Sequence, residues 1–172
     1  DPELVVQRAA LDCLLTWRDA WLVAHTEKLH ALLEPAKFRD TLAQLDLSAS
    51  SEQWGSARPL TMQVILRLLY GMLVSRRGLR TSGAGQGARR TAILAALFEC
   101  APDELGLLAD LMLTSFADRL PEPRKQLGFL GLLGDVLEHL GKPLAPSMPR
   151  FVHVVIAIAA SAEPSDPTMR LL

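Results

Sequence analysis

Five arginines surround a glycine-rich stretch in the middle of the chain, and their spacing indicates contact with phosphate groups. Arg76, Arg77 and Arg80 follow one predicted helix, and Arg89 and Arg90 begin the next. A guanidinium group presents a planar set of donors that matches phosphate in a bidentate manner. The free backbone N–H groups of a helix start also favour an anion. These five residues form the candidate site, with RNA phosphate as its candidate ligand.

Two other interpretations of the same stretch stay open. The charges also suit an acidic protein surface, and a solvated loop without any partner has the same composition. No aromatic residue lies between Arg76 and Arg90. Base stacking, and with it sequence-specific recognition of RNA, is therefore not indicated.

The charge of the chain is unevenly distributed over its 172 residues. The formal net charge is −1, which predicts no general attraction to nucleic acid or membrane. No Asp or Glu stands between Glu52 and Glu99, however, and this stretch holds seven arginines, Arg58 and Arg67 among them. The stretch therefore carries a formal charge of +7 and the rest of the chain −8.

Other patterns that carry chemistry are not met in this sequence. Gly83, Gly85 and Gly87 form a G-x-G-x-G run, but Ala88 and Arg89 follow where a Walker loop requires Lys and Ser or Thr. A dinucleotide fingerprint would need a preceding strand, and a leucine-rich helix is predicted there. The histidines show no metal-ligand spacing with a carboxylate or thiol, because His25 and His30 fall on different sides of a helix. We therefore expect no catalytic site, cofactor, metal or small-molecule substrate.

The cysteines and the longest apolar run also lead to expectations. Cys13 and Cys100 have no C-x-x-C partner and lie in apolar helical patterns, which predicts that both are buried free thiols. The apolar run from Phe151 to Ala162 is shorter than the ~20 residues that cross a bilayer. No membrane-spanning segment is expected.

Composition and periodicity predict an all-α chain. Leucine supplies 34 residues, whereas valine and isoleucine together supply 13, a balance that disfavours sheet proteins. Proline, glycine and polar residues separate eight apolar helical segments. These segments are expected at about 2–16, 19–33, 35–45, 58–75, 88–99, 102–117, 124–140 and 149–162.

Eight helices in this order make about four antiparallel pairs of ~40 residues each, which is the period of HEAT repeats. We therefore predict a HEAT/armadillo-like α-solenoid: one helical-repeat segment over 1–172, with a Gly/Arg-rich loop at about 76–90, as a fragment of a longer solenoid. A closed helical bundle is the alternative. The solenoid is favoured because nothing in the sequence resembles a terminal cap with a polar outer face.

The periodicity also predicts which side chains point inward. In the first helix these are Leu4, Leu11, Leu14 and Leu15. The helix at about 58–75 is apolar over most of its circumference, which predicts neighbours on two of its sides.

Several strings along the chain occur together in one known family. They are Val6–Leu14 (VQRAALDCL), Lys37–Leu42 (KFRDTL), Arg58–Leu60 (RPL), Ile65–Gly71 (ILRLLYG), Ser75–Arg76, Ala88–Leu94 (ARRTAIL), Glu104–Leu105 and Lys125–Leu130 (KQLGFL). Together they resemble the Down-regulated-in-metastasis family, the large U3 small-nucleolar-RNA-associated scaffold of the small-subunit processome. The Leu-Tyr-Gly element with the Arg-Arg helix start is the most specific part of the resemblance.

The resemblance implies a segment of a very long HEAT/armadillo solenoid that is non-catalytic and nucleolar. It implies a scaffold of the 90S pre-ribosome that supports pre-rRNA processing and 18S rRNA maturation. The implied partners are pre-ribosomal proteins, U3 snoRNP components and the backbone of pre-rRNA or snoRNA. The alternative function is a HEAT-type protein-binding adaptor, in transport or signalling, without RNA contact.

Overall fold

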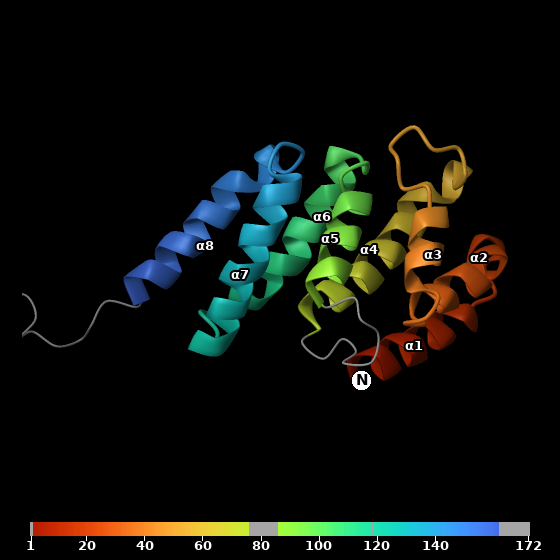
Figure 1. Ribbon diagram of the computed structural model, residues 1–172, viewed down its shortest axis with the longest axis horizontal. Coiled ribbons are helices and arrows are strands. Elements are labelled where there is room, and N and C mark those ends of the chain that lie inside the picture. Colours follow the sequence, from red (N-terminus) through yellow and green to blue (C-terminus); the bar gives the residue numbers. More distant parts are fainter. Residues whose placement is uncertain (1, 76–85, 118, 162–172) are drawn as a thin grey trace, which may run out of the picture.

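The computed structural model describes residues 2–75, 86–117 and 119–161, and these residues form helices without any strand (Figure 1). The expected all-α fold is confirmed, and each helix begins and ends within a few residues of its expected position. The helices are α1 (Pro2–Leu15), α2 (Ala20–Leu32), α3 (Phe38–Gln44), α4 (Arg58–Val74), α5 (Gln86–Leu97), α6 (Pro102–Leu113), α7 (Pro123–Leu140) and α8 (Met148–Ser161). Short 3₁₀ turns lie at Gly55–Ala57, Thr114–Phe116 and Ala145–Ser147.

The helices pack in two rows along an elongated molecule, which is an α-solenoid-like arrangement (Figure 1). Helix α3 packs on α5 and α5 on α7, whereas α1 packs on α4 and α4 on α6. An ion pair between Arg150 Nη1 and Asp110 Oδ1, 2.6 Å apart, connects α8 to α6. Helix α8 therefore lies at one end of the array, and α1 and α2 lie at the other.

Helix α4 is the centre of the core, as its apolar circumference predicted. It packs against α1, α2, α5, α6 and α7. Its buried side chains lie together on one broad side of the helix, and Leu60, which is 55% exposed, lies on the other side. The buried residues of α4 are Thr61, Met62, Ile65, Leu66, Leu68, Leu69, Met72 and Leu73.

Two expectations for α1 are wrong. Leu14 is 40% exposed instead of buried, and Cys13 is exposed instead of being a buried thiol. The second cysteine, Cys100, is buried as predicted. Apolar periodicity alone did not distinguish the covered side of α1 from its open side.

The two thiols are expected to differ strongly in reactivity. Burial raises the pKa of the Cys100 thiol to about 12, and the nearby Glu104 carboxylate adds to this. Since the thiolate is the reactive form, iodoacetamide at pH 8 should modify Cys13 in the native protein and react at least about 100 times more slowly with Cys100. Peptide mass spectrometry over time measures both rates. Equal rates in the native protein would contradict the burial of Cys100, and equal rates in denaturant are the control.

Arg58, at the start of α4, connects α4, α6 and the loop before α4. Its Nε and Nη2 donate to Oε1 and Oε2 of Glu104 at 2.7 and 2.9 Å. Its Nη1 donates to the Ser48 carbonyl at 2.8 Å, and Nη2 to the Leu47 carbonyl at 3.0 Å. Glu104 Oε2 also accepts the N–H of Ala101, where α6 begins, at 3.0 Å. The sequence analysis counted Arg58 among the positive charges and in the Arg58–Leu60 string, but its donors are used inside the fold.

Gly71 lets α1 approach α4 closely. The Nε2 of Gln7 donates to the Leu68 carbonyl at 3.1 Å, and a Cβ added at position 71 would lie 1.8 Å from that nitrogen. The glycine therefore leaves space for a hydrogen bond between the two helices. This gives a physical reason for the glycine of the Leu-Tyr-Gly string.

Gly71→Ala is expected to leave the free energy of unfolding nearly unchanged in the native sequence. Alanine gains about 1 kcal/mol of helix propensity, and displacing Gln7 loses about 1 kcal/mol of hydrogen bonding. In a Gln7→Ala background only the gain in helix propensity remains, so Gly71→Ala should raise the free energy of unfolding by about 1 kcal/mol. Urea unfolding of the native protein, the two single variants and the double variant measures these changes in the free energy of unfolding. The same effect in both backgrounds would show that Gln7 does not occupy this space.

Gly141 follows the last residue of α7. Its backbone is right-handed, at φ −55° and ψ −43°, so no left-handed cap forms. A Cβ at this position would lie 2.6 Å from the Leu137 carbonyl oxygen. Glycine is therefore needed here for space.

Among the described residues, no helix is both long and apolar enough to cross a membrane.

Candidate phosphate-contact site at the start of α5

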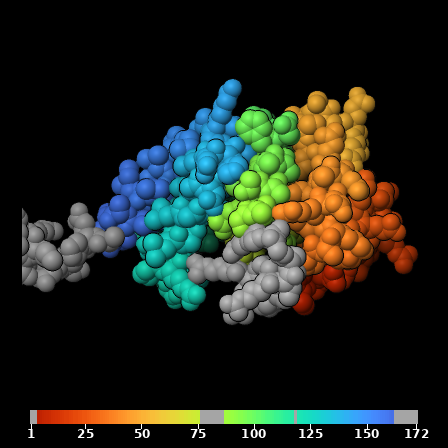
Figure 2. Space-filling model, viewed as in Figure 1, coloured from red at the N-terminus to blue at the C-terminus, as the bar shows by residue number. Residues whose placement is uncertain are grey.

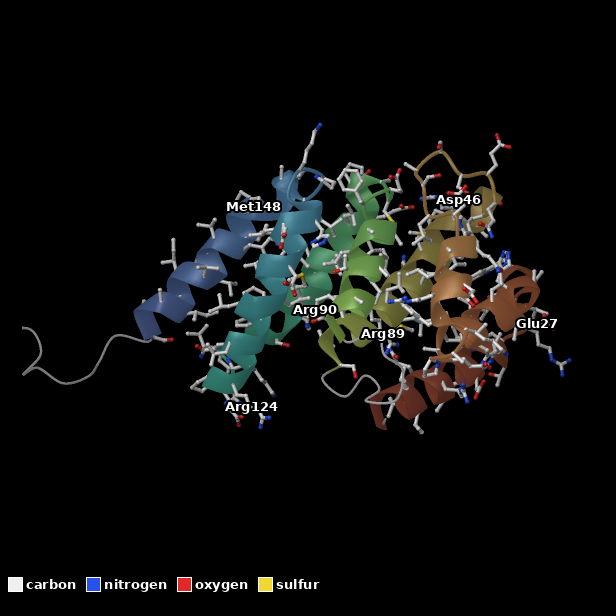
Figure 3. All side chains as sticks on the ribbon, in the orientation of Figure 1. Glu27, Asp46, Arg89, Arg90, Arg124 and Met148 are labelled. Atoms are coloured by element: carbon white, nitrogen blue, oxygen red, sulfur yellow. The ribbon has the colours of Figure 1, made fainter. Side chains whose placement is uncertain are left out.

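The structure places two of the five predicted site arginines. Arg89 and Arg90 lie in the first turns of α5, as the sequence indicated (Figure 3). Arg76, Arg77 and Arg80 lie outside the described residues. Phosphate contact by the five arginines therefore stays a prediction. The structure describes the two arginines that lie in α5.

Arg90 is held inside the fold. Its Nη1 donates to the carboxylate of Asp135 in α7, and its Nη2 donates to the Leu73 carbonyl at 3.2 Å. Leu73 belongs to the last turn of α4, where a cation is favoured by the helix dipole. One guanidinium thus joins α5 to both α7 and α4. No local pattern pointed to Asp135 as the partner of Arg90, because it lies 45 positions further along the chain.

Arg89 packs against an aromatic ring. Its guanidinium carbon lies 4.8 Å from the centroid of the Phe38 ring in α3, a cation–π distance. Burial lowers the pKa of Arg89 from its usual value. The contact joins α5 to α3, so the two arginines hold α5 to its neighbours on opposite sides.

Three donors of the arginine pair have no hydrogen-bond partner among the residues that the structure describes. They are Nε and Nη2 of Arg89 and Nε of Arg90, and all three are buried. A buried N–H without a partner costs about 1–3 kcal/mol. An acceptor that reached these donors would recover part of that cost, which is what an anionic ligand does.

A hollow of about 420 Å³ lies between α5 and α7 beside Arg90. Its charge is mixed, because Asp135 pairs with Arg90, and Glu138 adds a carboxylate. The His139 Nδ1 lies 2.9 Å from the Asp135 carbonyl oxygen. The lining residues are Gly87, Arg90, Thr91, Leu94, Asp135, Glu138 and His139. The α5 half of the candidate site is therefore less positive than the arginines alone suggest.

The histidines that the sequence analysis considered as metal ligands, His25 and His30, contact other side chains of the fold. The rings of His25 and Trp54 meet edge to face, with centroids 4.8 Å apart. The His30 Nε2 lies 3.2 Å from Asp12 Oδ1. In the described ranges, no group of three or more His, Cys, Asp and Glu side chains is arranged to hold a metal ion.

Comparison with known proteins gives matches over nearly the whole chain. The profile of the family described as U3 small nucleolar RNA-associated protein 20, N-terminal, matches residues 1–168. The U3 small nucleolar RNA-associated protein 20 of Schizosaccharomyces pombe (strain 972) is 29% identical over 181 aligned residues. That alignment covers 91% of this chain and 7% of the relative, so the chain spans a small part of the relative's length. No solved structure matches the chain.

These matches support the U3-associated part of the resemblance drawn from the sequence strings. They carry the name of protein 20, and not the name Down-regulated-in-metastasis.

Proposed function

Because the chain belongs to the family of U3 small nucleolar RNA-associated protein 20, we propose that it acts in the small-subunit processome. Its part is that of a non-catalytic scaffold segment that supports pre-rRNA processing and 18S rRNA maturation in the nucleolus. The observation that carries this proposal is the family match over residues 1–168. Its proposed partners are pre-ribosomal proteins and U3 snoRNP components. We also propose that the chain belongs to the narrower Down-regulated-in-metastasis family.

The two-row helix array suits such work. Helices packed in sequence give an extended surface, on which several partners can be held at fixed relative positions. Contacts from arginine to phosphate position an RNA without reading its sequence. Such a scaffold role needs no catalytic side chain.

Depletion of the protein in cells tests the proposal. Unprocessed precursors on the 18S side should accumulate and mature 18S rRNA should fall, while large-subunit rRNA stays near its normal level. Hybridisation with probes for each precursor measures this, and re-expression of the protein is the control. Normal 18S production after complete depletion, or an equal loss of both subunits' rRNA, would contradict the proposal.

A protein-binding adaptor without RNA contact is the second candidate. It is favoured by the internal use of Arg90, and by the carboxylates of Asp135 and Glu138 beside it. Both features reduce the attraction of the α5 start for an RNA backbone.

The arginines can be tested as phosphate contacts by measuring RNA retention against salt concentration. Changing all five site arginines to Gln should weaken retention and lower the slope of log K against log[salt] by up to about 3.5. The matched control changes five exposed arginines elsewhere to Gln: Arg8, Arg18, Arg39, Arg67 and Arg119. An equal change in both sets would mean that general charge is responsible.

Asp135→Asn separates a structural role of Arg90 from a role in RNA contact. The substitution breaks the ion pair with α7 and keeps the arginine, whereas Arg90→Gln removes both. If Arg90 contacts phosphate, only Arg90→Gln should reduce RNA retention. If the two variants behave alike, Arg90 acts through the position of α5.

A further inference from the structure

The hollow between α5 and α7 is lined by a carboxylate that no described residue pairs with. Figure 2 shows the face of the molecule on which α5 and α7 lie side by side. The hollow measures about 420 Å³, which lies within the ~300–1,000 Å³ of ligand sites. Among its charged lining residues, Arg90 and Asp135 neutralise each other as an ion pair. Glu138 is left over: its side chain is exposed and has no partner among the described residues.

The other polar groups of the hollow favour a ligand that donates hydrogen bonds. The Nδ1 of His139 lies 2.9 Å from the Asp135 carbonyl oxygen, which can only accept, so Nδ1 carries the proton. In the neutral ring, Nε2 is therefore an acceptor. The Nη1 and Nη2 donors of Arg90 are already used by the Asp135 carboxylate and the Leu73 carbonyl. A cationic donor would thus meet a carboxylate and a ring nitrogen that can accept its hydrogen bonds.

Two glycines of α7 leave space for the backbone of a partner beside the hollow. Gly131 and Gly134 are exposed, and a Cβ added to either would meet no described atom within 4 Å. They precede Asp135 and Glu138 by one helical turn, so they lie on the same side of α7 as the hollow. Leu127, one turn before Gly131, is 71% exposed. This side of α7 therefore combines an apolar side chain, open space and an unpaired carboxylate.

We propose that this side of α7 binds a basic segment of a partner protein, and that an arginine side chain of the segment lies in the hollow. A guanidinium group has five N–H donors and no acceptor, which suits the groups that line the hollow. It would pair with Glu138 while the ion pair of Arg90 and Asp135 stays intact. Without a Cβ at positions 131 and 134, the backbone of the segment can approach α7 closely. The inference rests on the scaffold role proposed above, and it names the chemistry of one contact through which a protein is held.

Two features of α7 favour a protein over an RNA as the occupant. The unpaired Glu138 carboxylate repels phosphate and attracts a basic side chain. The exposed Leu127 offers an apolar contact to a side chain of the segment. Phe129, which is the one Phe, Tyr or Trp residue of α7, is buried, so this helix offers no such ring on which a base could stack.

Binding of a basic peptide to the full-length protein tests the proposal. The probe is a fluorescent peptide of alanine, leucine and arginine, and its control contains citrulline, which keeps the size of arginine and removes the charge. Fluorescence anisotropy should show at least about tenfold tighter binding of the arginine peptide. Glu138→Gln should weaken that binding about three- to fivefold, as expected for an exposed charge pair. Glu27→Gln, at an exposed carboxylate of α2, is the control and should leave binding unchanged.

Gly134→Leu separates binding from stability. Leucine has the higher helix propensity and this position is open, so the fold should be kept. Its side chain would occupy the space proposed for the partner's backbone, and binding of the arginine peptide should fall at least about tenfold. Gly106→Leu, at an equally open position of α6, is the matched control and should leave binding unchanged. Circular dichroism verifies that each variant is folded.

Equal binding of the arginine and citrulline peptides would overturn the proposal, as would unchanged binding to Glu138→Gln and Gly134→Leu. Binding of a single-stranded RNA that Gly134→Leu weakens would assign this side of α7 to RNA. Peptide binding that is seen only after Arg76, Arg77 and Arg80 are changed to Gln would assign the hollow to an arginine of this chain. The depletion experiment does not depend on these outcomes, so the scaffold role and this contact can fail separately.

Discussion

Replacing Arg58 by Ala is expected to lower the free energy of unfolding by about 3 kcal/mol. The Arg58 and Glu104 side chains are 15% and 16% exposed, and they meet through two hydrogen bonds. Without the arginine, a largely buried carboxylate loses its partner, and the carbonyls of Leu47 and Ser48 lose their donors. Removing one member of a buried pair typically costs about 3–5 kcal/mol, and the remaining exposure puts this pair at the lower end. Urea unfolding measures the change.

Two control variants make this result specific. Arg67→Ala removes an equal charge from the exposed side of the same helix, where its Nη1 donates to the Gln63 carbonyl, and should cost less than about 0.5 kcal/mol. Arg58→Lys keeps the charge but loses the paired geometry, so its cost should lie between the two. Cys100 gives a local readout, since Arg58→Ala should speed its alkylation. An equal loss for Arg58→Ala and Arg67→Ala would show that Arg58 acts only through its charge.

Replacing Leu69 by Ala is expected to lower the free energy of unfolding by about 3 to 4 kcal/mol. Leu69 lies in the middle of α4 and is fully buried. Because α4 contacts five other helices, the packing around a deleted side chain cannot collapse easily, and a cavity remains. Urea or thermal unfolding measures the loss.

Leu60→Ala is the matched control for this prediction. It removes the same atoms from the same helix, but at a side chain that is 55% exposed, so the change should stay within about 0.5 kcal/mol. If both leucines cost the same, α4 does not lie at the centre of the core. A large loss at Leu60 alone would mean that another element covers that side of α4.

The helices could be predicted from the sequence because local signals determine them. Proline near the start of α4, α6 and α7, together with apolar periodicity, placed each helix within a few residues. What the sequence could not determine is which side of an outer helix has a neighbour. Leu14 and Cys13 follow the apolar pattern of α1, yet both are exposed. Periodicity describes a helix, whereas burial depends on elements elsewhere.

The candidate site was only partly predictable for a related reason. Charge and position along the chain located Arg89 and Arg90 at a helix start. Their partners come from distant positions: Asp135 for Arg90, and Phe38 for Arg89. In the sequence alone, an arginine that holds two helices together cannot be distinguished from one that binds a ligand. Arg58 was missed as a structural residue because Glu104 lies 46 positions away.

The most direct test of the proposed role is affinity purification of the tagged, full-length protein, with sequencing of the RNA that co-purifies. We expect enrichment of U3 RNA and of 18S-side precursor over a matched, equally tagged control protein. A discrete set of protein partners without either RNA would contradict it. The protein would then be a helical adaptor that binds proteins only.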